Sequence, residues 1–243
     1  MAPNEFPGLI RLIEERLDRE LLRPESITWH PNTWLRRFPS TSPAARYMGE
    51  LEGNSLNRDQ ILEIARQLPA LSGAERTNLL ERTFLLSQIW GFGTVGYGAY
   101  RTSKAMDAAQ FPAALEHVYD LLAESGPAAA YDSMRPGAPN HLAGLGPAFA
   151  TKFLYFAGYN SAPPKGAPSL ILDSLVGAAL HLGEPSVFGP RTGRFWDRGA
   201  YSMYVTAARW IMGNSTRYAL HPDDTERALF AIGKELRNPQ RPS

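Results

Sequence analysis

Glycine and proline divide this chain into short segments, and most of those segments have helical periodicity. The 243 residues include 21 glycines and 20 prolines, the residue types that most often end helices. Residues 8–21, for example, repeat leucine or isoleucine every four positions, which gives a helix one apolar face. Such patterns predict helices at 8–21, 57–68, 72–89, 110–124, 127–134, 147–157, 174–182, 199–212 and 222–236. We therefore expect a mainly α-helical protein.

Two of these helices begin with residues that cap free backbone amides. Asn57 is followed three residues later by Gln60, and Ser72 is followed in the same way by Glu75. The second pair is a capping box, in which a hydroxyl and a carboxylate each accept a hydrogen bond from the first turn. These pairs predict helix starts at residues 57 and 72.

Two stretches lack a clear period. Residues 22–56 carry tryptophans and prolines, which we interpret as loops or a short strand. Residues 90–101 hold four glycines with Trp90, Tyr97 and Tyr100, which predicts a flexible aromatic loop. We divide the chain into an N-terminal helix and irregular segment at 1–56 and a helical domain at 57–243.

The composition excludes several classes of chemistry. The chain has no cysteine, so a disulfide framework, a thiolate nucleophile and a cysteine-bound metal or iron–sulfur cluster are excluded. Its five histidines form no metal-binding motif, and neither a phosphate-binding P-loop nor a Gly-x-Ser-x-Gly elbow occurs. We expect no metal and no cofactor, and an oxygen or nitrogen nucleophile.

The charge is distributed unevenly along the chain. Residues 1–140 carry 14 Lys and Arg against 17 Asp and Glu, whereas residues 141–243 carry 11 against 7. The second part is therefore the better candidate for facing a polyanion. No signal segment or run of 18 apolar residues is present. We expect a cytoplasmic protein without a membrane segment.

The most informative stretch is residues 140–180. Leu142–Gly146 reads Leu-Ala-Gly-Leu-Gly, a tight turn that opens into a helix at Pro147 and exposes backbone amides suited to a phosphate. A Gly- and Pro-rich crossing follows that helix, and Asp173 then stands at the entry to another apolar helix. A plain connection between two helices would also explain the glycine turn by itself.

This order of hairpin, helix, crossing and aspartate resembles the helix-hairpin-helix DNA glycosylase superfamily, most closely the 8-oxoguanine DNA glycosylase fold. The resemblance covers about 40 residues and implies a mainly α, helix-hairpin-helix glycosylase-like fold, with the active-site cleft between two helical subdomains. It implies that Gly144, Leu145 and Gly146 bind DNA phosphates and that Asp173 is the catalytic carboxylate. One departure is that Ala143 replaces the usual hairpin proline.

The expected lysine nucleophile is also displaced. Bifunctional members of the superfamily place it where this chain has Ala148, and the lysine here is Lys152, about one helical turn further on. Burial there would lower its pKa and favour the free amine that attacks C1′. The alternatives are that Lys152 lies on the surface and that Asp173 is only a helix cap.

Two surfaces could assist DNA binding and base flipping. Tyr97, Tyr100 or Arg101, in the predicted aromatic loop, could fill the gap left by a flipped base, and Arg191 and Arg194 could clamp phosphates.

Three later aromatic residues, Trp196, Tyr201 and Tyr204, could wall a base pocket, although their helical spacing also suits a core.

The resemblance implies a monomeric enzyme that acts on double-stranded DNA. The leading hypothesis is a glycosylase that flips out and excises a damaged or modified base, such as an 8-oxoguanine-like lesion, with AP lyase activity if Lys152 forms a Schiff base. The alternatives are excision of hypermodified bases from phage DNA as an antiviral defence, and a DNA-binding module without catalysis.

Overall fold

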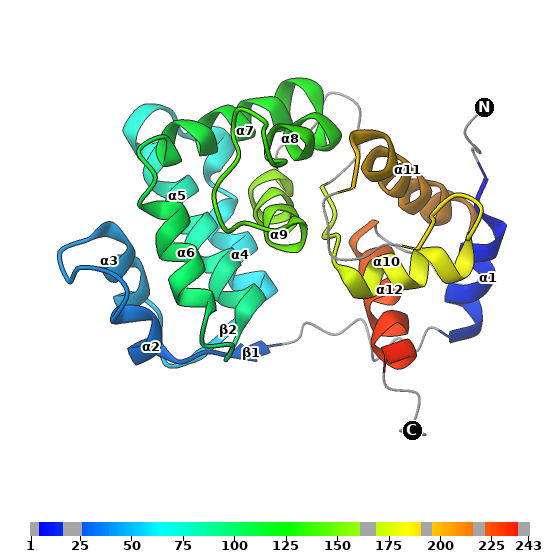
Figure 1. The fold of residues 1–243 in the computed structure, drawn as a ribbon, viewed down its shortest axis with the longest axis horizontal. Helices are drawn as coiled ribbons and strands as arrows, with labels where there is room; N and C mark the ends of the chain where they lie inside the picture. The colour runs from blue at the N-terminus through cyan, green and yellow to red at the C-terminus, as the bar shows by residue number, and fades with distance from the viewer. Residues whose placement is uncertain (1–4, 17–25, 161–168, 191–195, 216–221, 238–243) are drawn as a thin grey trace.

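The protein consists of two groups of helices on either side of an extended segment. The computed structural model describes residues 5–16, 26–160, 169–190, 196–215 and 222–237. Residues 169–173 run without regular structure between the two groups (Figure 1). Within the described residues twelve α-helices and one two-stranded sheet are present, so the prediction of a mainly α-helical fold is confirmed.

The larger group contains the elements from residue 26 to residue 158. In chain order they are β1 (Ser26–Thr28), α2 (Pro31–Leu35), α3 (Pro43–Gly49), β2 (Ser55–Asn57), α4 (Arg58–Ala65), a 3-10 turn (Leu68–Ala70), α5 (Gly73–Phe92), α6 (Gly98–Met106), α7 (Phe111–Ser125), α8 (Pro127–Ser133) and α9 (Pro147–Gly158). The two strands pair antiparallel, with Ile27 opposite Leu56.

The smaller group combines the two ends of the chain. It contains α1 (Pro7–Arg16), α10 (Ser174–Gly183), α11 (Arg198–Asn214) and α12 (Pro222–Arg237). Helix α1 packs against all three of the late helices, whereas α2 and α3 pack beside α6 and α5. Residues 1–56 therefore contribute to both groups, and the boundary at residue 57 stays a prediction.

All nine predicted helices are present, although residues 17–21 of the first lie outside the described residues, and one predicted cap is confirmed. The Asn57 side chain accepts a hydrogen bond from the Gln60 amide, and the Gln60 side chain accepts one from the Asn57 amide. The capping box at Ser72 was wrong in its geometry, because α5 begins there without a hydrogen bond to the Ser72 side chain.

Two irregular stretches contain helices that the sequence did not indicate. In residues 22–56, Pro31 and Pro43 stand in the first turn of α2 and α3, where proline is tolerated because the amide there has no helical partner. The predicted loop 90–101 was also too long. Helix α5 continues through Gly91 to Phe92, whose ring stacks on Phe149, and α6 begins at Gly98.

Helix α9 lies at the centre of the apolar packing. Phe153 contacts the ring of Phe84, which also packs against Phe111, in a core that extends into both groups of helices. Tyr155 and Phe156, on another face of α9, belong to a second core with the tryptophans of the β1–α2 region. Burial of α9 on several faces fixes its position, and with it the side chains that it carries toward the crossing segment. None of the helices described here is both long and apolar enough to cross a membrane.

Candidate active site

The glycine hairpin forms a tight turn at the start of α9. Gly144 has φ of +87°, a left-handed conformation that glycine adopts without steric cost, and the Leu145 amide donates to the Leu142 carbonyl at 3.1 Å. Leu142 and Leu145 are buried and anchor the turn. Gly146 precedes the first helical turn, and a Cβ placed on it would meet no atom within 4 Å. The hairpin thus presents open backbone at a helix N-terminus.

Lys152 lies further along α9, six residues after Gly146, and is buried among aromatic rings. The residue is only 8% exposed, and its Nζ donates a hydrogen bond to the Ala148 carbonyl at 3.4 Å. The amine stands 5.2 Å from the centre of the Phe149 ring and 6.0 Å from that of Trp90. Burial lowers the pKa of Lys152, while the charge of Asp173 raises it. The surroundings therefore favour a neutral amine.

Asp173 stands at the first turn of α10. Its Oδ1 accepts hydrogen bonds from the amides of Leu175 and Val176, both at 2.9 Å. The carboxylate therefore caps α10 at the end where the helix dipole stabilises negative charge. It remains partly exposed, unlike Lys152.

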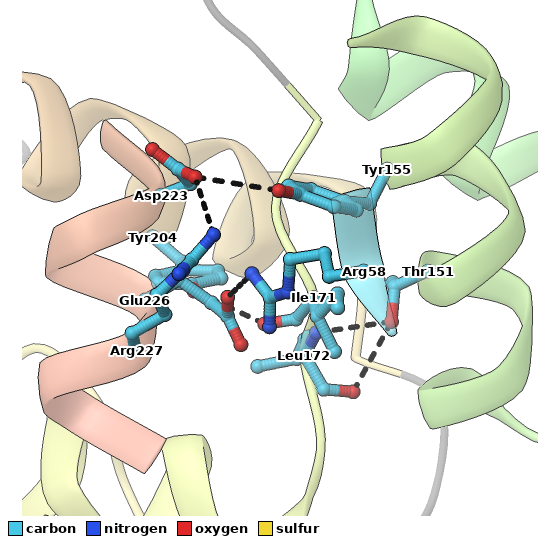
Figure 2. Close-up of polar contacts among 9 residues, drawn as sticks. All are labelled: Arg58, Thr151, Tyr155, Ile171, Leu172, Tyr204, Asp223, Glu226 and Arg227. Carbon is cyan, nitrogen blue, oxygen red and sulfur yellow. Dashed lines mark hydrogen bonds and ion pairs between the residues drawn. The ribbon is translucent and has the colours of Figure 1, made fainter. Parts of the chain in front are cut away.

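A hydrogen bond joins the immediate neighbours of these two residues in the chain. Thr151, which precedes Lys152, accepts from the amide of Leu172, which precedes Asp173, with Oγ1 and N 2.9 Å apart. Figure 2 shows this contact between α9 and the crossing segment. This bond ties the part of α9 that carries Lys152 to the segment that carries Asp173, and the two residues are near enough for the charge of Asp173 to act on the pKa of Lys152.

Two tyrosines of α11 hold the rest of the crossing segment. The hydroxyl of Tyr201 donates to the Leu170 carbonyl at 2.8 Å, and that of Tyr204 donates to the Ile171 carbonyl at 3.0 Å. Both side chains are fully buried. Burial raises the pKa of both tyrosines, so these hydroxyls stay protonated and able to donate. Their observed contacts support the backbone that carries Asp173.

A buried ion pair joins the two groups of helices next to this crossing. Arg58 of α4 donates from Nη1 to Oε2 of Glu226 on α12 at 2.8 Å, and the two side chains are 9% and 2% exposed. The guanidinium also lies over the rings of Tyr155 and Trp90, at 4.9 and 5.2 Å. Burial raises the pKa of Glu226, and Arg58 opposes that rise.

A second polar contact between the groups runs beside the first. The hydroxyl of Tyr155 on α9 donates to Oδ2 of Asp223 on α12 at 3.3 Å, and the same oxygen pairs with Arg227 (Figure 2). These contacts fix α12 against α4 and α9.

An exposed aromatic and basic surface adjoins the hairpin. Tyr97 and Tyr100, at the start of α6, are 57% and 52% exposed. The guanidinium of Arg101 lies 5.0 Å from the Tyr97 ring centre, and that of Arg37 lies 5.5 Å from the Tyr100 ring centre. The Arg101 carbonyl oxygen is 3.8 Å from the position of a Cβ on Gly144. The predicted residues of the aromatic stretch and of the hairpin are therefore neighbours in space.

Comparison with known proteins gives one match. Residues 20–230 match the family described as "Putative 8-oxoguanine DNA glycosylase OGG-like protein". The chain belongs to this OGG-like family. No curated protein and no solved structure gives a significant match.

Three of the predicted site residues have no described contact with Lys152 or Asp173. Trp196 is buried, and its backbone amide donates to the Tyr131 hydroxyl at 2.8 Å, so its place in a base pocket stays a prediction. Arg191 and Arg194 lie outside the described residues. Within the ranges that the structure covers, no cluster of three histidine or acidic side chains could hold a metal ion.

The sequence did not predict that Arg58 and Glu226 join the two groups of helices, or that Thr151 binds the crossing segment. Arg58 and Glu226 are 168 positions apart, and neither belongs to a local motif. The sequence can indicate a buried ion pair only by a charged residue on the apolar face of a helix. Glu226 has such a position in the segment 222–236, but this does not identify its partner.

Proposed function

We propose that this protein is a DNA glycosylase that flips out and excises a damaged or modified base, with 8-oxoguanine-like lesions as the substrate class. The observation that carries the proposal is a buried amine and a helix-capping carboxylate on two segments that the Thr151–Leu172 hydrogen bond joins, with the carboxylate near enough for its charge to act on the amine. Membership in the OGG-like family supports the same activity.

DNA would bind through the hairpin and the exposed surface beside it. The open backbone at Gly144–Gly146 suits a phosphate, because a helix N-terminus favours negative charge. Tyr97 and Tyr100 are exposed aromatic rings that can stack on bases, and Arg37 and Arg101 supply positive charge beside them. Insertion of one of these side chains would fill the gap left by the flipped nucleotide.

The reaction then uses the two residues at the crossing. The neutral Nζ of Lys152 attacks C1′ as the bond from C1′ to the base nitrogen breaks, and the base leaves with that electron pair and takes up a proton. Asp173 stabilises the positive charge that develops on the deoxyribose. A proton passes from the nitrogen to the ring oxygen as the sugar ring opens, which gives a protonated Schiff base. Loss of a proton from C2′ then breaks the 3′ carbon–oxygen bond by β-elimination, and the 3′ phosphate leaves.

Base release from defined duplexes tests the activity. Each duplex carries one lesion, phage DNA with hypermodified bases is included, and free base is quantified for the wild type and for Asp173→Asn. We expect the variant to lose activity by a factor of about 100 or more. The matched control is Asp197→Asn, because Asp197 also caps a helix, accepting from the Ala200 amide. Undiminished release by Asp173→Asn contradicts the role of the carboxylate, and wild-type binding without release supports a non-catalytic module.

Borohydride trapping tests the nucleophile. Reduction of the Schiff base leaves a covalent protein–DNA adduct, which we expect for the wild type and for Lys234→Ala but not for Lys152→Ala. Lys234 is an exposed lysine of α12 and serves as the control. An adduct that persists in Lys152→Ala assigns the nucleophile to another amine.

A further inference from the structure

Lys152 reaches its buried position through a gap on the neighbouring helix, at Gly91. This glycine is the last but one residue of α5, in an ordinary helical conformation. A Cβ added to it would lie 2.6 Å from Cδ and 3.0 Å from Cε of Lys152, and 3.0 Å from Cε1 of Phe149. Real Cβ atoms essentially never come within 3.0 Å of another heavy atom. The lysine stem therefore occupies the space that any other residue at position 91 would fill.

The other sides of this gap are rigid. The Phe149 ring is stacked on Phe92 with the ring centres 3.8 Å apart, and the Trp90 ring packs edge to face on Phe156 at 5.5 Å. Neither ring can move aside without breaking a contact in the core. The flexible lysine stem is the part that would give way to a methyl group at position 91.

We propose that Gly91 is a positioning residue for Lys152, and that the gap at Gly91 holds the amine at the place from which it attacks the sugar. This inference rests on the proposed function, in which Lys152 is the nucleophile. The helical backbone at position 91 accepts alanine without strain, so the effect of a methyl group there comes from its contacts with Lys152 and Phe149.

The substitution Gly91→Ala tests the proposal. We expect a protein that still folds cooperatively, as its melting curve shows, and a rate of borohydride adduct formation lower by about 100-fold, since small misplacements of a reacting group have effects of that size. The matched control is Gly213→Ala. Gly213 is the last but one residue of α11, and a Cβ on it would meet nothing within 4 Å, so its adduct rate should equal that of the wild type.

The pH dependence of trapping gives a readout that a purely structural role would not change. A lysine displaced from the gap is less buried, so its pKa rises and the midpoint of adduct formation moves to higher pH in Gly91→Ala. An unchanged rate and midpoint in a folded Gly91→Ala protein overturn the proposal. If the wild type forms no adduct at all, the proposed nucleophile fails instead, and the two failures are thereby distinguished.

A measurement on the unaltered protein applies even if Gly91→Ala does not fold. Reductive methylation of the native wild type, followed by mass spectrometry, compares Lys152 with the exposed lysines Lys104 and Lys234. We expect Lys152 to be methylated at least about tenfold more slowly, because the closed gap keeps the reagent from the amine. Equal rates for the three lysines overturn the proposal.

Discussion

Lys152 and Asp173 belong to different groups of helices and have opposite surroundings. The lysine lies in an apolar gap among aromatic rings, where burial lowers its pKa. The aspartate lies at the partly exposed start of α10, where two backbone amides donate to it. An apolar site favours a neutral amine, and a helix N-terminus favours a negative carboxylate. Each environment thus suits the role that we propose for its residue, a nucleophile for Lys152 and a charge-stabilising group for Asp173.

For the proposed reaction, the two environments must be held in a fixed position relative to each other. The contacts that join them are polar and buried: the Arg58–Glu226 ion pair, and the hydroxyl contacts of Thr151, Tyr201 and Tyr204 with the crossing segment. Such contacts are directional, whereas apolar packing tolerates small sliding movements. We expect them to hold the lysine and the aspartate in register.

The largest effect is expected from breaking the ion pair. In Arg58→Met the carboxylate of Glu226 keeps its buried position without a countercharge, which should cost about 3–5 kcal/mol of unfolding free energy. Denaturation with urea measures this loss. In the double variant Arg58→Met, Glu226→Leu no charge is left buried, so most of the stability should return. A double variant as unstable as the single one contradicts this account.

Restored stability in the double variant need not restore the reaction. Because the directional contact between α4 and α12 is absent, we expect the rate of base release to stay below that of the wild type. Release at the wild-type rate would mean that apolar packing alone keeps the lysine and the aspartate in register.

A smaller effect is expected at the hydroxyl between the two environments. Thr151→Val keeps the shape of the side chain but leaves the buried amide of Leu172 without its acceptor, at a cost of about 1–3 kcal/mol. Thr83 is the matched control, because it is equally buried in a helix and its Oγ1 has no hydrogen-bond partner among the described residues. Thr83→Val should therefore be neutral or stabilising in urea denaturation, and equal losses in the two variants refute the assignment.

The pH dependence of trapping measures the lysine environment itself. Below the pKa of Lys152 the neutral fraction falls about tenfold per pH unit, equivalent to about 1.4 kcal/mol. Because burial lowers this pKa from its usual 10.5, the rate of adduct formation should rise with pH and level off below 10.5. A rate that still rises through pH 10.5 contradicts the burial of the amine.

The same lysine should make stability depend on pH in a defined direction. Between its folded pKa and 10.5 the unfolded chain binds more protons than the folded protein, so stability should rise with pH across that window. In Lys152→Met this part of the slope should be absent.

The sequence predicted the local features well, because they depend on neighbours in the chain. All nine expected helices are present, and the Asn57 cap formed as expected. The hairpin and Asp173 were found because each has a local pattern of glycines or of a cap before an apolar run. The helix at 98–106 was missed because glycines on both sides of Tyr97 resemble a loop, and packing of Phe92 on Phe149 overrides that tendency.

The features that join the two groups could not be predicted in this way. The partner of Arg58 is 168 positions away in the chain. The residue that makes room for Lys152 is Gly91, 61 positions before it. Helical periodicity relates neither pair, because it applies only within one helix. Tyr201 and Tyr204 show the same limit. Their spacing suits both a pocket wall and a core, and only the folded chain shows their hydroxyls on the carbonyls of the crossing segment.

The smallest effect on stability is expected for substitutions of Asp173. Comparing two of them separates its role as the cap of α10 from its proposed role in the reaction. Asp173→Ala removes the acceptor for the amides of Leu175 and Val176 and should cost about 1 kcal/mol. Asparagine caps helices about as well as aspartate, so Asp173→Asn should stay within about 0.5 kcal/mol of the wild type in urea denaturation. Both variants lack the negative charge, and both should lose base release to a similar extent. If Asp173→Asn instead keeps the activity and Asp173→Ala loses it, the side chain acts through the position of α10, and the charge that stabilises the sugar must come from another residue.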